Sequence, residues 1–160
     1  MTLRPATPGD LPTILAFVRG LAVYERLEHE AVATEADFAA ALFSERPAAE
    51  VVIAELDGQP VGFALFFPTF STFVGKPGMW LEDLFVLPEH RGRGVGKALL
   101  VHLARLAVER GYGRFEWSVL DWNEPAIGFY RSIGAVGMDE WTTQRVSGDA
   151  LHALASMPLS

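Results

Sequence analysis

The spacing of apolar residues changes from a strand-like run to a helical period between residues 80 and 107. Leu81, Leu84, Phe85, Val86 and Leu87 form a run that is typical of a strand buried on both faces, and Pro88 ends it because proline has no backbone N–H to donate. Beyond it the apolar positions form one stripe of a helix, at Val95, Leu99, Leu103, Leu106 and Ala107. The pattern predicts a central strand, a glycine-rich loop and an amphipathic helix.

The N-terminal half is predicted to hold a strand, two helices and an antiparallel hairpin. Thr34 and Asp37 resemble a capping box at a helix start, and Asp57-Gly58 is a strong hairpin signal. The expected elements are a strand over Thr2–Pro5, a helix to about Tyr24, a helix after Thr34, and strands over Glu50–Leu56 and Gln59–Phe67, followed by a surface loop over residues 68–78.

The C-terminal part is predicted to add strands and two short helices. Asn123 is a good N-cap, and Gly134 is expected to stop the helix that Asn123 opens. The expected elements are a strand over Phe115–Leu120 parallel to the central strand, a helix after Asn123, strands over Ala135–Trp141 and Thr142–Val146, and a helix over Asp149–Met157.

Composition excludes several kinds of chemistry. The chain has 160 residues without repeats or linkers, so we expect a single domain over residues 1–160. It contains no cysteine, which excludes disulfides, a thiolate zinc site and a cysteine nucleophile. The four histidines stand at no spacing that would place two on one helix face, so no metal site is expected.

The charge and hydropathy of the chain bear on its partners and location. A formal net charge of −7 disfavours nucleic acid, which needs a basic face. It suits a cationic substrate or serves only solubility, and the sequence leaves both open. Neither a membrane-spanning apolar run nor a signal peptide is evident, so no membrane partner is expected and the cytoplasm is the predicted location.

Residues 91–97, Arg-Gly-Arg-Gly-Val-Gly-Lys, separate the predicted central strand from its helix. A helix start leaves backbone N–H groups unpaired, and glycines let an anion approach them, so the loop predicts binding of a phosphate or pyrophosphate. The alternative is a glycine-rich turn without a ligand.

Three phosphate-binding patterns can be compared with this loop. A P-loop is disfavoured because Arg91 stands where its first glycine belongs and Ala98 where its hydroxyl belongs. The spacing matches a dinucleotide fingerprint only in part, although Glu116 stands where a ribose-binding acid is expected. Arg91-x-x-Gly94-x-Gly96 after a strand resembles in full the loop of the GNAT superfamily of acyl-CoA-dependent N-acetyltransferases.

The order of the predicted elements also resembles the GNAT fold. The resemblance implies an α/β protein with a mixed, mostly antiparallel central sheet flanked by helices. Within that superfamily, five blocks resemble the diamine or spermidine/spermine N-acetyltransferases: Leu3–Thr7, Leu21–Glu25, Val61–Phe67, Leu81–Val86 and Asp121–Arg131.

Acetyl transfer from a thioester to an amine requires that the amine lose a proton and that the departing thiolate be stabilised. Glu82 and Asp83 are adjacent acids on the predicted central strand. Because neighbours on a strand point to opposite faces, we expect only one of them to point at a given ligand. Tyr130 lies on the apolar face of its predicted helix, where tyrosine is also common as a core residue.

The resemblance implies roles for individual residues. The tyrosine matching Tyr130 is the general acid near the thiolate, and the glutamate matching Glu82 is a base that acts through water and contacts the substrate. Tyr24 and Glu25 match positions that line the amine site, and Glu82 or Asp83 adds negative charge to it. The expected acetyl-CoA contacts are Leu84, Phe85 and Val86 along the pantetheine arm, Arg91, Gly92, Arg93, Gly94, Val95, Gly96 and Lys97 at the pyrophosphate, and Asn123, Glu124, Pro125, Ala126 and Tyr130 beside the cofactor.

The predicted activity is transfer of an acetyl group from acetyl-CoA, by direct attack, to a primary amine of a small diamine or polyamine. The chain has neither a cysteine nor a G-x-S-x-G elbow for an acetyl-enzyme. One alternative is acetylation of an amino-acid side-chain amine such as that of a lysine analogue, with Arg26 as the candidate partner for its carboxylate. Another is a non-catalytic acyl-CoA-binding module. The resemblance also implies a homodimer, and it leaves Asp139 and Glu140 without a firm counterpart.

Overall fold

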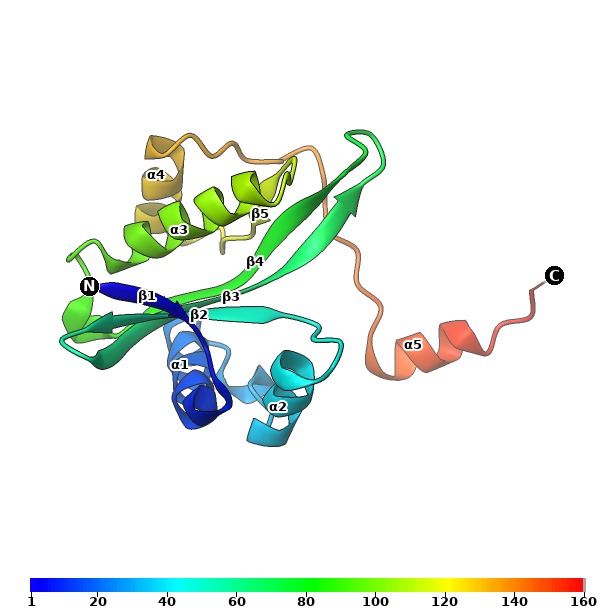
Figure 1. The fold of residues 1–160 in the computed structure, drawn as a ribbon. Coiled ribbons are helices and arrows are strands. Elements are labelled where there is room, and N and C mark those ends of the chain that lie inside the picture. The colour runs from blue at the N-terminus through cyan, green and yellow to red at the C-terminus, as the bar shows by residue number, and fades with distance from the viewer. Residues whose placement is uncertain (160) are drawn as a thin grey trace. The chain divides into compact units, whose positions relative to one another are not determined.

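The computed structural model describes residues 1–159, which divide into two compact units, residues 1–120 and residues 121–159. The first unit holds the whole sheet. Its strands are β1 (Thr2–Pro5), β2 (Glu50–Leu56), β3 (Gln59–Ser71), β4 (Lys76–Val86) and β5 (Phe115–Trp117). They lie in the order β1-β2-β3-β4-β5, and every neighbouring pair is antiparallel except β4 with β5 (Figure 1).

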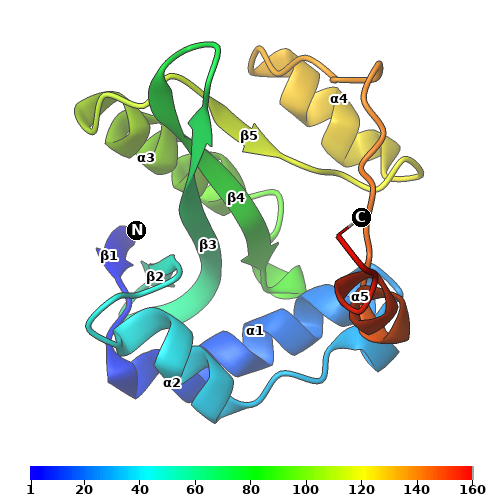
Figure 2. The same ribbon diagram turned by 90° about the vertical axis from the view of Figure 1, so that its right-hand side faces the viewer.

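Helices cover both faces of this sheet. On one face lie α1 (Leu11–Tyr24) and α2 (Glu35–Phe43), and on the other lies α3 (Val95–Glu109) (Figures 1 and 2). Single turns of 3₁₀ helix occur at Pro8–Asp10, Glu28–Glu30 and Pro88–His90. The expected α/β class, with a mixed, mostly antiparallel sheet flanked by helices, is confirmed.

The core under α1 is built on aromatic side chains. The ring of Phe17 on α1 lies 5.6 Å from that of Phe63 on β3 and 5.7 Å from that of Phe85 on β4. Ile14 and Ile53 are fully buried in the same cluster. Because β4 is anchored on this core through Phe85, the residues on either side of Phe85 are held in fixed positions.

Local signals placed most helix ends correctly. The hydroxyl of Thr34 accepts a hydrogen bond from the Asp37 backbone N–H, and the Asp37 carboxylate accepts one from the Thr34 N–H, so the predicted capping box is confirmed. Before α1, the buried Asp10 carboxylate accepts two hydrogen bonds from Arg4, at 2.8 and 2.9 Å. This pair ties the edge strand β1 to the start of α1.

Residues 68–78 are the first place where the prediction is wrong. They were expected to form a surface loop, but β3 continues to Ser71 and β4 begins at Lys76, which leaves only a short turn between them. The ladder extends because β3 and β4 pair along their full length, although Phe73 at the tip is 96% exposed. Strand β5 is shorter than the expected Phe115–Leu120.

The second unit holds α4 (Glu124–Ser132) and α5 (Gly148–Ala155). The two strands expected over Ala135–Trp141 and Thr142–Val146 do not form in the described residues. A strand needs a partner for its backbone groups, and the alternating apolar pattern alone does not supply one. The apolar side chains of that pattern are exposed instead, Val136 by 81% and Trp141 by 77%. Among residues 1–159, no helix has the length and apolar character needed to cross a bilayer.

Candidate functional site

Strand β4 carries a bulge at Glu82. On β3 the consecutive residues Leu65 and Phe66 pair with Asp83 and Leu81, so Glu82 is the extra residue without a partner in the register. A bulge rotates the residues that follow it and breaks the alternation of side chains. Glu82 and Asp83 therefore both line one pocket, whereas strict strand alternation would place them on opposite faces of the sheet.

Strands β4 and β5 pair over only three residues. Met79, Trp80 and Leu81 pair with β5, and the register ends there. From Glu82 onward β4 pairs with β3 alone, so Leu84, Phe85 and Val86 have a strand edge that β5 does not cover. A free strand edge can bind an extended ligand through backbone hydrogen bonds, and the amide groups of a pantetheine arm fit such an edge.

Three carboxylates influence one another in the first unit. Glu25 caps the C-terminus of α1, and Glu82 and Asp83 lie on β4. Burial, then the charges of Glu82 and Glu25, raise the pKa of Asp83 to about 7. Burial, then the charge of Glu82, also raises the pKa of Glu25. A carboxyl group with a pKa near 7 can gain or release a proton near neutral pH, and its ionised form attracts a cation.

Trp80 orients one of these acids. Its indole Nε1–H donates a hydrogen bond of 2.7 Å to Oε2 of Glu82. The bond is charge-assisted when Glu82 is ionised, and it restricts the exposed carboxylate to one position. The sequence gives no signal for this role, because Trp80 reads as another apolar residue of the strand.

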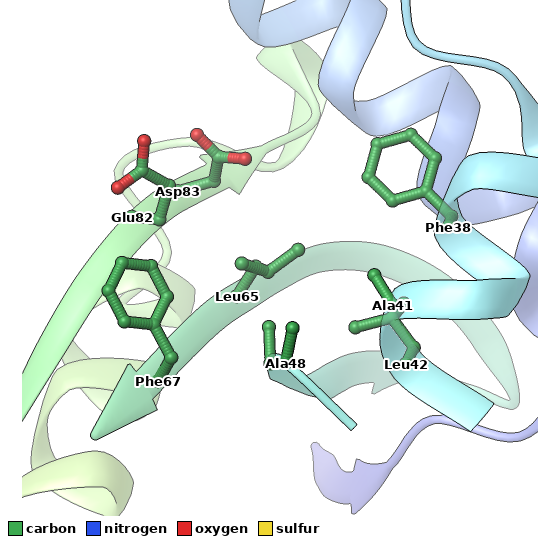
Figure 3. A pocket seen from close by; sticks show the side chains of 9 residues that line it. Phe38, Ala41, Leu42, Ala48, Leu65, Phe67, Glu82 and Asp83 are labelled. Carbon is green, nitrogen blue, oxygen red and sulfur yellow. The ribbon is translucent and has the colours of Figure 1, made fainter. Parts of the chain in front are cut away.

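The pocket beside these carboxylates has a volume of about 390 Å³. Figure 3 shows Glu82 and Asp83 on β4 at one side of it, with apolar side chains from α2, β3 and the segment before β2 around the rest. Its lining residues are Phe38, Ala41, Leu42, Ala48, Ala49, Leu65, Phe67, Glu82 and Asp83. The apolar members were not predicted as site residues, because they come from α2, the segment after it and β3, and no sequence motif links these three segments.

The glycine-rich loop ends in a helix start of the expected kind. Gly92 and Gly94 have φ values of 74° and 82°, in the left-handed region that glycine tolerates. The first backbone hydrogen bond of α3 runs from the Ala98 N–H to the Gly94 carbonyl, so the N–H groups of residues 95–97 precede it. A β-carbon at either glycine would project into open space, so the loop leaves room for a ligand to approach its backbone. These features fit the pyrophosphate of acetyl-CoA.

Arg91 is held by its neighbours. Its Nε donates to the Val86 carbonyl at 2.9 Å, and its guanidinium lies 4.9 Å from the ring centroid of Tyr24 and 5.5 Å from that of Phe85. The side chain thus links the end of α1 to the end of β4. Arg93 contacts Nδ1 of His90 at 3.2 Å, and Lys97 is exposed on the first turn of α3.

The remaining predicted residues lie in the second unit. Asn123 caps α4 as expected, since its side chain accepts a hydrogen bond from the Ala126 N–H, and Glu124 and Pro125 follow in the first turn. Tyr130 is half-buried on α4, with its ring 5.8 Å from that of Phe129. Asp139 and Glu140 are exposed. Across residues 1–159, no three of the His, Asp and Glu side chains form a group that could hold a metal ion.

Comparisons with known proteins agree on one family. Residues 17–135 match the model of the acetyltransferase (GNAT) family. The chain is 36% identical to an L-ornithine N5-acetyltransferase of Arabidopsis thaliana, over 95% of this chain and 86% of that protein. It is 35% identical to a thialysine N-epsilon-acetyltransferase of Sus scrofa, over 96% of both chains. A solved integron cassette protein from the mobile metagenome of V. cholerae has a TM-score of 0.81 and 29% identity, over 98% of each chain.

Proposed function

The chain belongs to the acetyltransferase (GNAT) family, and we propose that it transfers the acetyl group of acetyl-CoA to one amine of a small molecule that carries two. Acetyl-CoA-dependent N-acetylation of an amine is the activity of its family and named relatives. The proposal concerns the substrate, the site residues and their roles. The observation that carries it is the group of three carboxylates, Glu25, Glu82 and Asp83.

The electrostatics of this group favour a cationic molecule. Burial, and then repulsion by the charges of Glu82 and Glu25, raises the pKa of Asp83 to about 7, and an ammonium that binds nearby relieves the repulsion. A substrate with two amines brings two such groups, one at Glu82 and Asp83 and the other at Glu25. A cation paired with a partly desolvated carboxylate is worth roughly 1.5–3 kcal/mol.

Asp83 is also a candidate to accept the proton that the amine must lose. An alkylammonium has a pKa near 10.4, so it needs a base at neutral pH, and a base works best when its own pKa lies near the operating pH. The environment of Asp83 meets that condition. We therefore assign proton acceptance to Glu82 and Asp83 together, with Trp80 holding Glu82 in place.

The other roles follow from the chemistry of acyl transfer. Acetyl-CoA supplies an activated thioester, whose carbonyl carbon the amine nitrogen attacks as the C–S bond breaks and the amide forms. The edge of β4 at Leu84, Phe85 and Val86 holds the pantetheine arm, and residues 91–97 hold the pyrophosphate. Asn123, Glu124, Pro125 and Ala126 border the same molecule. Tyr130 gives its hydroxyl proton to the departing thiolate.

A second candidate substrate is the side-chain amine of a basic amino acid. The relatives named for ornithine and thialysine favour it, because both of these molecules carry two amines and a carboxylate. Arg26, directly after Glu25, is the expected partner of that carboxylate, and its φ of 62° is unusual for a residue other than glycine.

A screen of matched amines tests the proposal. We expect 1,4-diaminobutane to exceed n-butylamine by at least about 10-fold in kcat/KM, measured as CoA release, because only the diamine offers a second ammonium. Ornithine and lysine belong in the same screen, and a preference for them over 1,4-diaminobutane would select the second candidate. Equal rates for the diamine and the monoamine would rule out recognition of a second charge.

Two variants locate the second charge. Glu25→Gln should raise KM for 1,4-diaminobutane about 10-fold and leave n-butylamine nearly unchanged. Glu28→Gln is the matched control, because Glu28 is an exposed acid in the next turn of the chain. A similar loss in both variants would indicate a general effect of negative charge.

The homodimer and the cytoplasmic location belong to the proposal as well. The exposed apolar side chains of residues 136–159 support association with a second copy, because such surface is costly to leave in water. Light scattering of the purified protein would test the first, and cell fractionation the second.

A further inference from the structure

The pocket between α2 and β3 has two chemically distinct parts. One side carries the carboxylates of Glu82 and Asp83, and the other side is lined by alanine, leucine and phenylalanine alone (Figure 3). A volume of about 390 Å³ lies within the range of small-molecule sites. The ligand that complements such a pocket has a cationic head and an uncharged hydrocarbon chain.

The apolar wall is supported by the fold. Phe38 and Leu42 stand one helical turn apart on the face of α2 that meets the sheet, and Leu65 is buried in the core beneath them. The Ala41 carbonyl accepts hydrogen bonds from the N–H groups of Ala48, at 2.7 Å, and Ala49, at 3.4 Å. These bonds fold the segment after α2 back against the helix, so the pocket exists before any ligand arrives.

We propose that this pocket is a subsite for the hydrocarbon chain of a primary amine, and that the enzyme acetylates apolar alkylamines and arylalkylamines as a second substrate class. This rests on the proposed function in one respect, that the reacting amine lies at Glu82 and Asp83. The chain of the amine then extends between Phe38 and Phe67, away from the charges.

The lining decides the chemical class. A second ammonium or an α-carboxylate in the apolar part would lose its water without gaining a partner, which costs several kcal/mol. Each methylene that leaves water for the pocket should raise the binding constant of the amine about three- to fourfold. The subsite therefore selects uncharged chains, while Glu25 serves the second ammonium of shorter substrates.

The kinetics of an n-alkylamine series test the subsite. From n-butylamine to n-octylamine we expect kcat/KM to rise about threefold for each added methylene until the pocket is full, chiefly through KM. 2-Phenylethylamine should exceed ethylamine for the same reason. A flat series would overturn the proposal.

Filling the pocket supplies the structural control. Ala41→Phe and Ala48→Phe, made separately so that one failure to fold does not end the test, should each abolish the gain with chain length. Ala40→Phe places the same side chain on the exposed face of α2, so this variant should still show the rise of kcat/KM with chain length. If the folded pocket variants still show the rise of kcat/KM with chain length, the pocket does not hold the hydrocarbon chain. If these variants instead change oligomeric state and keep that rise, the pocket is a contact for a second copy of the chain.

The outcome for diamines separates this inference from the proposed function. With 1,4-diaminobutane, the filling variants should retain rates within about twofold of the parent, since its chain runs toward Glu25. A flat alkylamine series alongside a clear preference for the diamine removes the subsite and leaves the proposed function intact. A rising series without any preference for a second charge removes the diamine proposal and supports the subsite.

Discussion

Glu82 and Asp83 are adjacent carboxylates with different surroundings. Glu82 is exposed and accepts a hydrogen bond from the Trp80 indole, whereas Asp83 is half-buried and carries the raised pKa. One of the pair is thus oriented by a neighbour, and the other is tuned by burial and like charges. This division suits a site that must both bind an ammonium and take its proton.

Replacing Asp83 tests whether function is maintained at a cost in stability. The folded pKa of about 7 lies above the ordinary value of 3.8, so the stability present below pH 4 is lost as the pH rises through 7. At pH 8 the free energy of unfolding of Asp83→Asn should therefore be on the order of 2 kcal/mol higher than that of the parent. At pH 4 the two proteins should be nearly equal.

The same variant should lower kcat by about 10²-fold, because it cannot accept a proton. Denaturant unfolding at pH 4 and pH 8, together with steady-state kinetics, measures both effects. A variant that is no more stable at pH 8 than the parent would show that Asp83 is ionised without penalty.

At the scale of elements, one strand–loop–helix segment presents all the backbone groups assigned to acetyl-CoA in the first unit. Strand β4 loses its partner β5 after Leu81, which opens one edge. The loop then reaches α3 through two glycines in the left-handed region. The edge and the helix start are consecutive in the chain, so a single extended molecule can contact both.

Gly94→Val tests the loop. Valine at a φ of 82° strains the backbone and hinders close approach to the N–H groups of α3, so we expect acetyl-CoA affinity to fall by at least 10-fold, about 1.4 kcal/mol. Calorimetric titration of the folded variant gives the affinity.

Gly75→Val is the matched control for that substitution. Gly75 has a φ of 70° in the turn between β3 and β4, and a β-carbon there also meets nothing within 4 Å. The two variants should lose similar stability, but only Gly94→Val should lose affinity. Equal affinities in both would show that residues 91–97 do not bind the cofactor.

At the scale of the whole molecule, the proposed reaction draws on both compact units. The acids, the β4 edge and the glycine-rich loop lie in residues 1–120, and Tyr130 lies in residues 121–160. A proton donor for the thiolate is required because a thiolate is poorly stabilised away from water.

Tyr130→Phe tests the contribution of the second unit. Loss of the hydroxyl should lower kcat by roughly 10²-fold with little change in acetyl-CoA affinity, since the ring is retained. Tyr112→Phe removes a hydroxyl three residues beyond the end of α3 and should leave kcat unchanged. Near-normal turnover by Tyr130→Phe would assign this tyrosine to packing alone.

Much of this protein could be predicted without coordinates, because the signals involved are local. Apolar periodicity, the Thr34 capping box, Asp57-Gly58 and the Asn123 cap predicted the five α-helices and the strands β1 and β2 within a few residues, whereas β3 and β4 extend into the predicted loop over residues 68–78. The order of elements with the loop motif indicated the family. The caps and the turn act within about four residues and the apolar stripe within one helix, so a linear sequence contains these signals in full.

Which residues lie together in space depends on the packing of segments that are distant in the sequence. The bulge at Glu82 arises from the register of β3 against β4, and it turns two acids toward one pocket where strand alternation predicted one. The Trp80 contact, the position of Arg91 between two rings and the apolar wall under α2 depend on packing between distant segments. The missing strands over residues 135–146 have the same cause, because their pattern is present in the sequence but strand formation depends on a partner edge that only three-dimensional structure can provide.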